Sequence, residues 1–324
     1  MAAAIGTPAG AETTWRASIF GPQRASTQPF EWFAREVTAK TGGQLRFDIT
    51  YGQAKPTEAI DLLKSGSAEV AYLCVQYHGD QIPLATVIDL PMLAPDNLVA
   101  LDRVALALGE HPPVQAELKK WNVRMLLPVP LPQYQLMGTR RVARIDDLQG
   151  ARVRISAEMG KVLEEYGATI SVIPSTESAA ALKSGALDLV ALPYPYAFAT
   201  FRVHEAARYV TDRISLGAPL CFLGVGQKAW EALPVKVQDV VLGLRQPAVA
   251  RYEHAYVHDD AAQIALFRAK GIEFVPFSVA DRARLVAKAV KVWQAWVEER
   301  EKQGLKGREV FEFTQTKIRE FTRR

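Results

Sequence analysis

The sequence predicts an α/β protein built on two sheets. Two series of short apolar strands alternate with helical segments, one starting at Trp15 and the other near Arg124. The chain has 324 residues, which is more than one hydrophobic core usually organises. Strands separated by short helices favour parallel sheets with helices on both faces, and two such sheets imply a cleft between them.

The first series starts with an extended segment and ends in a buried strand. Its first helix has helical apolar spacing and is ended by Thr41-Gly42-Gly43, and its second helix stops at Gly66. The expected elements are strand 15–20, helix 29–40, strand 45–51, helix 56–65 and strand 69–75.

The second series repeats this alternation. The expected elements are strands 124–129, 134–138 and 151–155, helix 158–166, strand 169–173, helix 177–184 and strand 188–192.

Long helices follow the second series. Residues 234–270 are helical in pattern, and Pro247 should bend or break the helix because its ring removes a donor and clashes with the preceding turn. An amphipathic helix is expected over 281–303, and 304–307 separate it from a short last helix.

Composition excludes several classes of function. Hydrophobic residues make up 49% of the chain and charged residues 23%, which is typical of a globular protein. The net charge of +4 is spread along the sequence, so nucleic acid is a poor candidate partner. No run approaches the roughly 18–20 apolar residues that span a bilayer, so direct membrane insertion is not expected.

The first eleven residues are small and weakly apolar. Ala9-Gly10-Ala11 resembles the remnant of a secretory cleavage site, although a basic segment and a full apolar segment are missing. We interpret this start as a trimmed export signal.

Cys74 and Cys221 are the two cysteines, too few for a metal cluster or a disulfide scaffold. The pattern favours two buried thiols that act as small hydrophobes over a reactive or bridged pair.

Short motifs along the chain resemble, in order and spacing, the extracytoplasmic solute-binding proteins of TRAP (tripartite ATP-independent periplasmic) transporters, the DctP-like family. The resemblance covers about residues 15–303. It rests on Thr41-Gly42-Gly43, Tyr51-Gly52-Gln53, 62–66 with Glu69, Leu90-Pro91, Asp147-Leu148-Gln149-Gly150-Ala151-Arg152-Val153-Arg154, Gly167-Ala168, Glu177, Ala181-Leu182, Gly185 with Asp188, and 230–234 with Gln238.

The resemblance implies a two-lobed periplasmic-binding-protein fold with a ligand cleft between the lobes and a long domain-crossing helix over 234–270. Such a receptor closes on an organic acid in the periplasm and hands it to membrane permease subunits, with no catalytic step and no cofactor. The expected division is 12–133 plus 219–250 for lobe I, 134–218 plus 251–303 for lobe II, 304–324 for a tail packed back on the body, and 133–135 and 217–221 for the hinges.

The resemblance also implies that Arg154 binds the ligand carboxylate, since the family has a strand arginine at this place. A planar guanidinium can hold a carboxylate with two parallel hydrogen bonds, and lobe closure would strengthen them by excluding water. The alternative is an arginine paired with a neighbouring acid at the surface. Arg152 shares the strand face by alternation and is expected to be solvated.

Four positions at which this sequence differs from the sugar-acid binders of the family narrow the class of ligand that is expected. Cys74 and Tyr77 stand where sialic-acid binders have Glu and Arg, Tyr134 where they have a second Arg, and Leu192 where many members have Asn. Unmatched sugar hydroxyls would cost about 1–3 kcal/mol each in such a lining. The expected ligand is a monocarboxylate with an apolar or aromatic body.

Four further residues are candidate ligand contacts. Tyr194, with Tyr196 and Phe198 after it, could add a ring face, although such aromatics pack equally well as core. The same alternative holds for Tyr77 and Tyr134. The family resemblance adds Ser156 and Ser175 as small cleft residues, and Thr27, with Gln28, in the loop after the first strand.

Other functions remain as alternatives. His254 and His258 share a helical face and could in principle hold zinc, but no HExxH motif accompanies them, and no Cys/His hydrolase motif is present. A cation that bridges a 2-oxo acid lacks a visible acidic ligand set, so no metal site is assigned. A receptor that signals to a membrane kinase would need the same ligand-driven closure.

Overall fold

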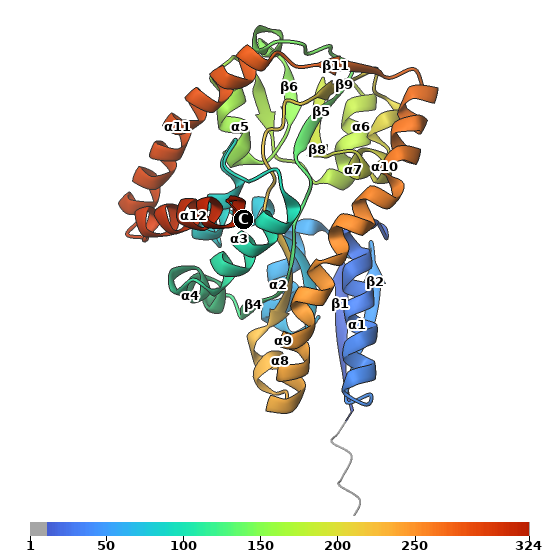
Figure 1. Cartoon of the computed structure of the whole chain (residues 1–324), viewed down its shortest axis with the longest axis vertical. Helices are drawn as coiled ribbons and strands as arrows, with labels where there is room; N and C mark the ends of the chain where they lie inside the picture. The colour runs from blue at the N-terminus through green and yellow to red at the C-terminus, as the bar shows by residue number, and fades with distance from the viewer. Residues whose placement is uncertain (1–11, 324) are drawn as a thin grey trace, which may run out of the picture.

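The computed structural model describes residues 12–323 (Figure 1). The interpreted export signal at residues 1–11 lies outside the described residues. Two sheets form the body, one in each half of the view, and helices surround both.

The first sheet has the strand order β2-β1-β3-β10-β4. β1 runs parallel to β2 and β3, whereas β10 runs antiparallel to β3 and β4. Buried aromatic side chains of the sheet and of the neighbouring α1 form its core, among them Trp15, Phe30 and Phe33. The strands are β1 Thr13–Ile19, β2 Leu45–Tyr51, β3 Val70–Cys74, β4 Val123–Val129 and β10 Cys221–Gly226.

The second sheet has the order β11-β9-β5-β8-β6-β7. β6 runs parallel to β7 and β8, whereas β5 runs antiparallel to β8 and β9. The strands are β5 Tyr134–Gly138, β6 Arg152–Arg154, β7 Thr169–Ser171, β8 Leu189–Pro193, β9 Tyr209–Asp212 and β11 Glu273–Pro276.

Both sheets are mixed, which corrects the expectation of parallel sheets. β5 and β10 are the reversed strands, and each receives the chain directly from the other sheet. Such a strand starts at the edge of the sheet where the parallel strands end, so it runs antiparallel to them. The two crossings are hydrogen-bonded to each other, from Tyr134 N to Gly217 O (2.8 Å) and from Leu216 N to Tyr134 O (3.1 Å). The predicted hinges at 133–135 and 217–221 include these crossing segments, whereas the predicted boundary at 250/251 lies between α9 and α10. The division into lobes and its movement stay predictions.

The helical segment after Pro234 breaks as expected. α9 (Val235–Val249) contains Pro247, and α10 (Arg251–Ala269) begins after Ala250. The pair runs past both sheets in Figure 1, and α10 contacts both α1 and α7. The Pro247 ring removes the helical hydrogen bond to the carbonyl of residue 243 in the preceding turn, and the two helices are divided three residues later, at Ala250.

Two helices between β3 and β4 were not indicated by the pattern. They are α3 (Leu98–Glu110), which is capped by the Asn97 side chain, and α4 (Pro112–Lys120), which starts on a proline. α12 packs against α3 and α11. The remaining helices are α1 Gln28–Lys40, α2 Ala59–Ser65, α5 Ala157–Glu164, α6 Ser178–Lys183, α7 Tyr196–Thr200, α8 Gln227–Glu231, α11 Val279–Lys302 and α12 Gly307–Thr322.

Cys74 and Cys221 form a disulfide. They are direct partners in the antiparallel register of β3 and β10, with Cα atoms 4.0 Å apart. The interpretation of the two cysteines as free buried thiols is therefore wrong. Because they are 147 positions apart in the chain, nothing local in the sequence indicates that they meet.

Among the described helices, none combines the length and apolar character needed to span a bilayer.

Candidate ligand site between the two sheets

A small cavity of about 20 Å³ lies where the ends of β3 and β8 approach each other, and residues of both halves line it. This volume holds about one water molecule and is far below the roughly 300–1,000 Å³ of small-molecule sites, so a ligand would need these walls to separate. Its lining residues are Phe20, Arg24, Tyr72, Cys74, Gln76, Tyr77, Leu131, Tyr134, Ser175, Leu192, Pro193, Tyr196, Ala197, Phe201 and Cys221.

Arg154 is the last residue of β6, and only 1% of it is exposed. Its Nε donates to Ile173 O (3.0 Å), Nη1 to Ala191 O (3.1 Å) and Nη2 to the Tyr77 hydroxyl (2.7 Å). Within residues 12–323, no carboxylate lies at ion-pair distance from this guanidinium. The strand therefore presents a buried cation whose partners are all neutral, with N–H donors to spare.

Arg152 shows the surface pairing that was the alternative for Arg154. It is exposed and forms an ion pair with Asp188, with Nη2 and Oδ1 2.6 Å apart. Two arginines on one strand thus differ sharply in environment. Arg152 is accordingly a suitable control for changes at Arg154.

Tyr77 connects Arg154 with the cavity. It ends the short 3-10 turn after β3, its ring lines the cavity, and its hydroxyl accepts from Arg154 and from Ser175 N (3.1 Å). Neither bond uses the hydroxyl hydrogen of Tyr77. This hydrogen is free to be donated to an acceptor beside Arg154.

Four other predicted contacts also lie in the cavity wall: Cys74, Tyr134, Ser175 and Leu192. Burial raises the pKa of the Tyr134 hydroxyl, which therefore stays neutral. Cys74 contributes a disulfide sulfur and has no thiol to offer.

Arg154 itself does not line the cavity, and neither do the other three predicted contacts, Ser156, Thr27 and Tyr194. Ser156 is buried at the start of α5, and its Oγ has no hydrogen-bond partner among the described residues. The Thr27 hydroxyl is bonded to the backbone of Arg24. Tyr194 packs near Phe198, and burial raises its pKa to about 12.

Arg24 is a cavity residue that the sequence pattern did not indicate. It follows β1, is 6% exposed and lies among the rings of Phe20, Tyr72 and Phe201. The available signal was weak: no acid stands three or four residues away to pair with it. Its burial depends on rings that are distant in the sequence.

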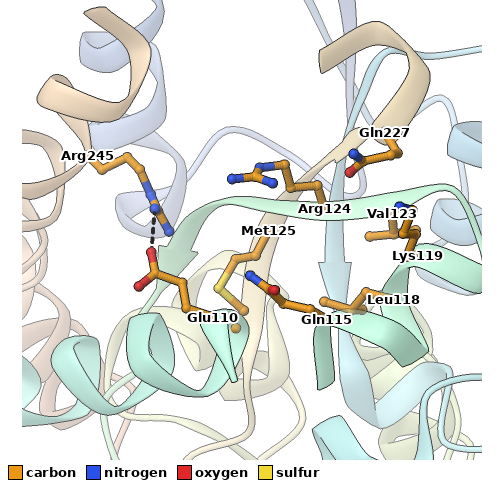
Figure 2. A pocket seen from close by; sticks show the side chains of 10 residues that line it. Glu110, Gln115, Leu118, Lys119, Val123, Arg124, Met125, Gln227 and Arg245 are labelled. Carbon is orange, nitrogen blue, oxygen red and sulfur yellow. Dashed lines mark hydrogen bonds and ion pairs between the residues drawn. The ribbon is translucent and has the colours of Figure 1, made fainter. Parts of the chain in front are cut away.

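A second hollow lies on the first half alone and is shown in Figure 2. Its volume is about 170 Å³, and it is lined by residues of α3, α4, β4, α8 and α9. Arg245 forms an ion pair with Glu110 there (3.0 Å), and Arg124 lies over the Trp230 ring. Since one half supplies the whole lining, closure between the halves would not enclose a ligand in this hollow.

The geometry does not support the enzyme alternatives. A Cys/His hydrolase would need a thiolate, but Cys74 is in a disulfide, and His78 bonds to Gln81 and to Pro56 O. His254 and His258 are exposed on α10. Within residues 12–323, no three His, Cys, Asp or Glu side chains are grouped to hold a metal.

Two sheets joined by paired crossing segments, with a cationic and aromatic cavity between them, are the architecture of a two-domain solute receptor. The family model for bacterial extracellular solute-binding proteins, family 7 (DctP), matches residues 17–300. The chain belongs to this family, which supplies the solute-binding components of TRAP transporters.

Individual relatives agree with the family. A solute-binding protein of Chromohalobacter salexigens is 23% identical over 314 residues, 92% of this chain and 89% of that protein. A TRAP solute-binding protein of Rhodoferax ferrireducens, solved with copurified benzoate, superposes with a TM-score of 0.86 at 20% identity and covers 96% and 99% of the two chains. Another from Chromohalobacter salexigens, with bound D-glucuronate, gives 0.82 at 20% identity, with 94% and 99% covered.

Proposed function

We propose that this protein captures an organic acid with an apolar or aromatic body in the periplasm and delivers it to the permease subunits of a TRAP transporter. Arg154 binds the carboxylate, and Tyr77 donates its hydroxyl hydrogen to the same group. The protein binds and releases its ligand without a catalytic step.

The observation that carries the proposal is the buried, acid-free guanidinium of Arg154 behind the cavity wall. A buried charge without a counter-ion is costly, and an incoming carboxylate offsets that cost through charge-assisted hydrogen bonds. The backbone carbonyls of Ile173, after β7, and of Ala191 in β8 fix the guanidinium, so little side-chain entropy is lost on binding.

The cavity lining supports the apolar or aromatic body. Most of its wall consists of rings, aliphatic side chains and a disulfide, and Arg24, Gln76 and Ser175 are its polar side chains other than the tyrosines. Aromatic rings and aliphatic groups pack a benzoate-like body well, whereas a uronate would bring hydroxyls that need partners. The two solved relatives contain benzoate and D-glucuronate. Of these two, benzoate is the better model for the ligand that we propose for this chain.

Closure of the two lobes around the acid is the proposed mechanism of ligand capture. We place lobe I at 12–133 plus 219–250 and lobe II at 134–218 plus 251–303, with hinges at 133–135 and 217–221. The ligand is enclosed when the lobes close, because the two sheets contribute opposite walls of the cavity. Water leaves the closed cavity, and this strengthens the bonds to Arg154.

A thermal-shift screen of carboxylates tests the function. A cognate acid at about 100 times its dissociation constant should add about 2.7 kcal/mol to the free energy of unfolding. The panel should pair benzoate and phenylacetate with glucuronate, and aliphatic acids with their 2-oxo analogues. Stabilisation by glucuronate but by no apolar or aromatic acid would contradict the proposal.

A further inference from the structure

Arg24 is a second buried guanidinium at the site; it lines the cavity itself and comes from the opposite half to Arg154. Its Nη1 donates to Phe20 O (2.7 Å) and Pro22 O (2.9 Å). Its Nε and Nη2 have no backbone acceptor, and no carboxylate of residues 12–323 lies at ion-pair distance. The cation is thus held in place with several donors left over.

The loop around Arg24 is built to hold this position. Gly21 has a φ of +68°, and a Cβ on it would lie 3.2 Å from the Phe201 ring of the other half. Thr27 accepts from Arg24 N and donates to Arg24 O. The guanidinium carbon lies 4.7 Å from the ring centroids of both Phe20 and Tyr72. Backbone and rings therefore fix Arg24 before any ligand arrives.

A chain of rings connects the two cations. Arg24 lies over Phe20, Phe20 meets Tyr77 edge-on at 6.2 Å, and Arg154 lies 6.0 Å from the Tyr77 ring centroid. Arg24 thus lines the cavity, and Arg154 lies behind Tyr77 in its wall. One carboxylate neutralises one of them and leaves the other buried without a counter-group.

We propose that the ligand carries, at the end away from its carboxylate, a second hydrogen-bond-accepting group that Arg24 binds from lobe I. This inference rests on the proposed function and narrows it. The acceptor is a hydroxyl oxygen or a second carboxylate, and both are recognised by the same N–H donors.

Calorimetric titration of matched acids tests the inference. The aromatic set is benzoate with its 3- and 4-methyl, 3- and 4-hydroxy, and 1,3- and 1,4-dicarboxylate relatives. The aliphatic set is hexanoate, 6-hydroxyhexanoate and hexanedioate. In the parent protein, the best acceptor-bearing acid should bind at least about tenfold more tightly than its methyl or unsubstituted counterpart. The hydroxyl and dicarboxylate arms identify which acceptor is preferred.

Arg24→Met keeps the side-chain length and removes the donors. The ratio between acceptor-bearing and methyl-bearing acids should fall to within about threefold, a loss of selectivity that mere loosening of the loop would not produce. Arg46→Met, at an exposed residue of β2 in the same half, should keep the parent's ratio. If Arg24→Met does not fold, Arg24→Lys replaces it and should lower the ratio by removing the planar fork.

Two results separate the two proposals. If the acids bind through Arg154 but the methyl-bearing acids bind as tightly as the acceptor-bearing ones, or Arg24→Met keeps the ratio, the role of Arg24 is overturned and the proposed function stands. If no acid binds, or Arg154→Ala binds as the parent does, the proposed function fails and the inference fails with it.

Discussion

Arg154 and Tyr77 join the two halves of the molecule through a hydrogen bond of 2.7 Å between Nη2 and the hydroxyl oxygen. Arg154 belongs to the second sheet, and Tyr77 follows β3 of the first. Ser175 N donates to the same oxygen. The group proposed to bind the carboxylate is thus held by a cavity residue of the other half, so the proposed ligand binding and lobe closure would both involve this contact.

Tyr77→Phe should weaken acid binding by about tenfold or more. The change removes the hydroxyl hydrogen proposed for the carboxylate and leaves the donors of Arg154 and Ser175 without their acceptor. Titration calorimetry with the cognate acid measures the effect. Tyr194→Phe, outside the cavity lining, should keep the affinity within about twofold. Equal affinities for the Tyr77 variant and the parent would remove Tyr77 from the site.

Removing the disulfide should destabilise the protein by about 2–5 kcal/mol, because the bond closes a loop of 147 positions in the unfolded chain. The melting temperature of the parent should therefore fall on treatment with a reductant. The double variant Cys74→Ala with Cys221→Ala is the control, and reductant should leave its melting temperature unchanged. An identical melting temperature for oxidised and fully reduced parent would contradict this prediction.

Stability should fall as the pH rises from about 4 to 7, in part through Asp102. Burial raises the pKa of this carboxyl to about 7, and its Oδ1 has no hydrogen-bond partner among the described residues. The folded protein therefore keeps a proton that the unfolded chain releases near the ordinary value of 3.8, so the folded state is favoured at the acid end. Glu117, whose pKa burial also raises to about 7, acts in the same direction.

Asp102→Asn keeps the neutral form at every pH, so its stability should fall less over this interval, by an amount on the order of 3 kcal/mol. Denaturant unfolding at several pH values measures the difference. Asp48→Asn, at an exposed position, should follow the parent's curve. A parent and an Asp102 variant with parallel curves would show that Asp102 is ionised in the folded protein.

Much of the fold could be predicted from the sequence, because its strands and helices have strong local hydrophobic periodicity. The break near Pro247 follows from one residue's geometry. The reversed directions of β5 and β10 could not be predicted from single residues, because they depend on which sheet the chain comes from. The disulfide could not be predicted for the same reason. It forms because strand pairing brings together two cysteines that are far apart in the sequence.

The candidate site was predictable only where strand position decides it. Arg154 and Leu192 sit on buried strands, and Tyr134 begins another, so alternation and the family resemblance together pointed to them. The burial of Arg24 could not be predicted from the sequence, because it depends on Tyr72 and Phe201, which are distant along the chain. Thr27 stands next to the site, but its hydroxyl is used to hold Arg24.

The most direct test of the account is calorimetric titration of the cognate acid into the parent, Arg154→Ala and Arg152→Ala. Arg154 makes its contacts in the protein interior, and Arg152 pairs with Asp188 at the surface of the same strand. The account predicts that Arg154→Ala loses affinity by about a hundredfold or more, whereas Arg152→Ala binds within about twofold of the parent. A folded Arg154→Ala protein with the parent's affinity would contradict the central claim that this guanidinium binds the ligand carboxylate.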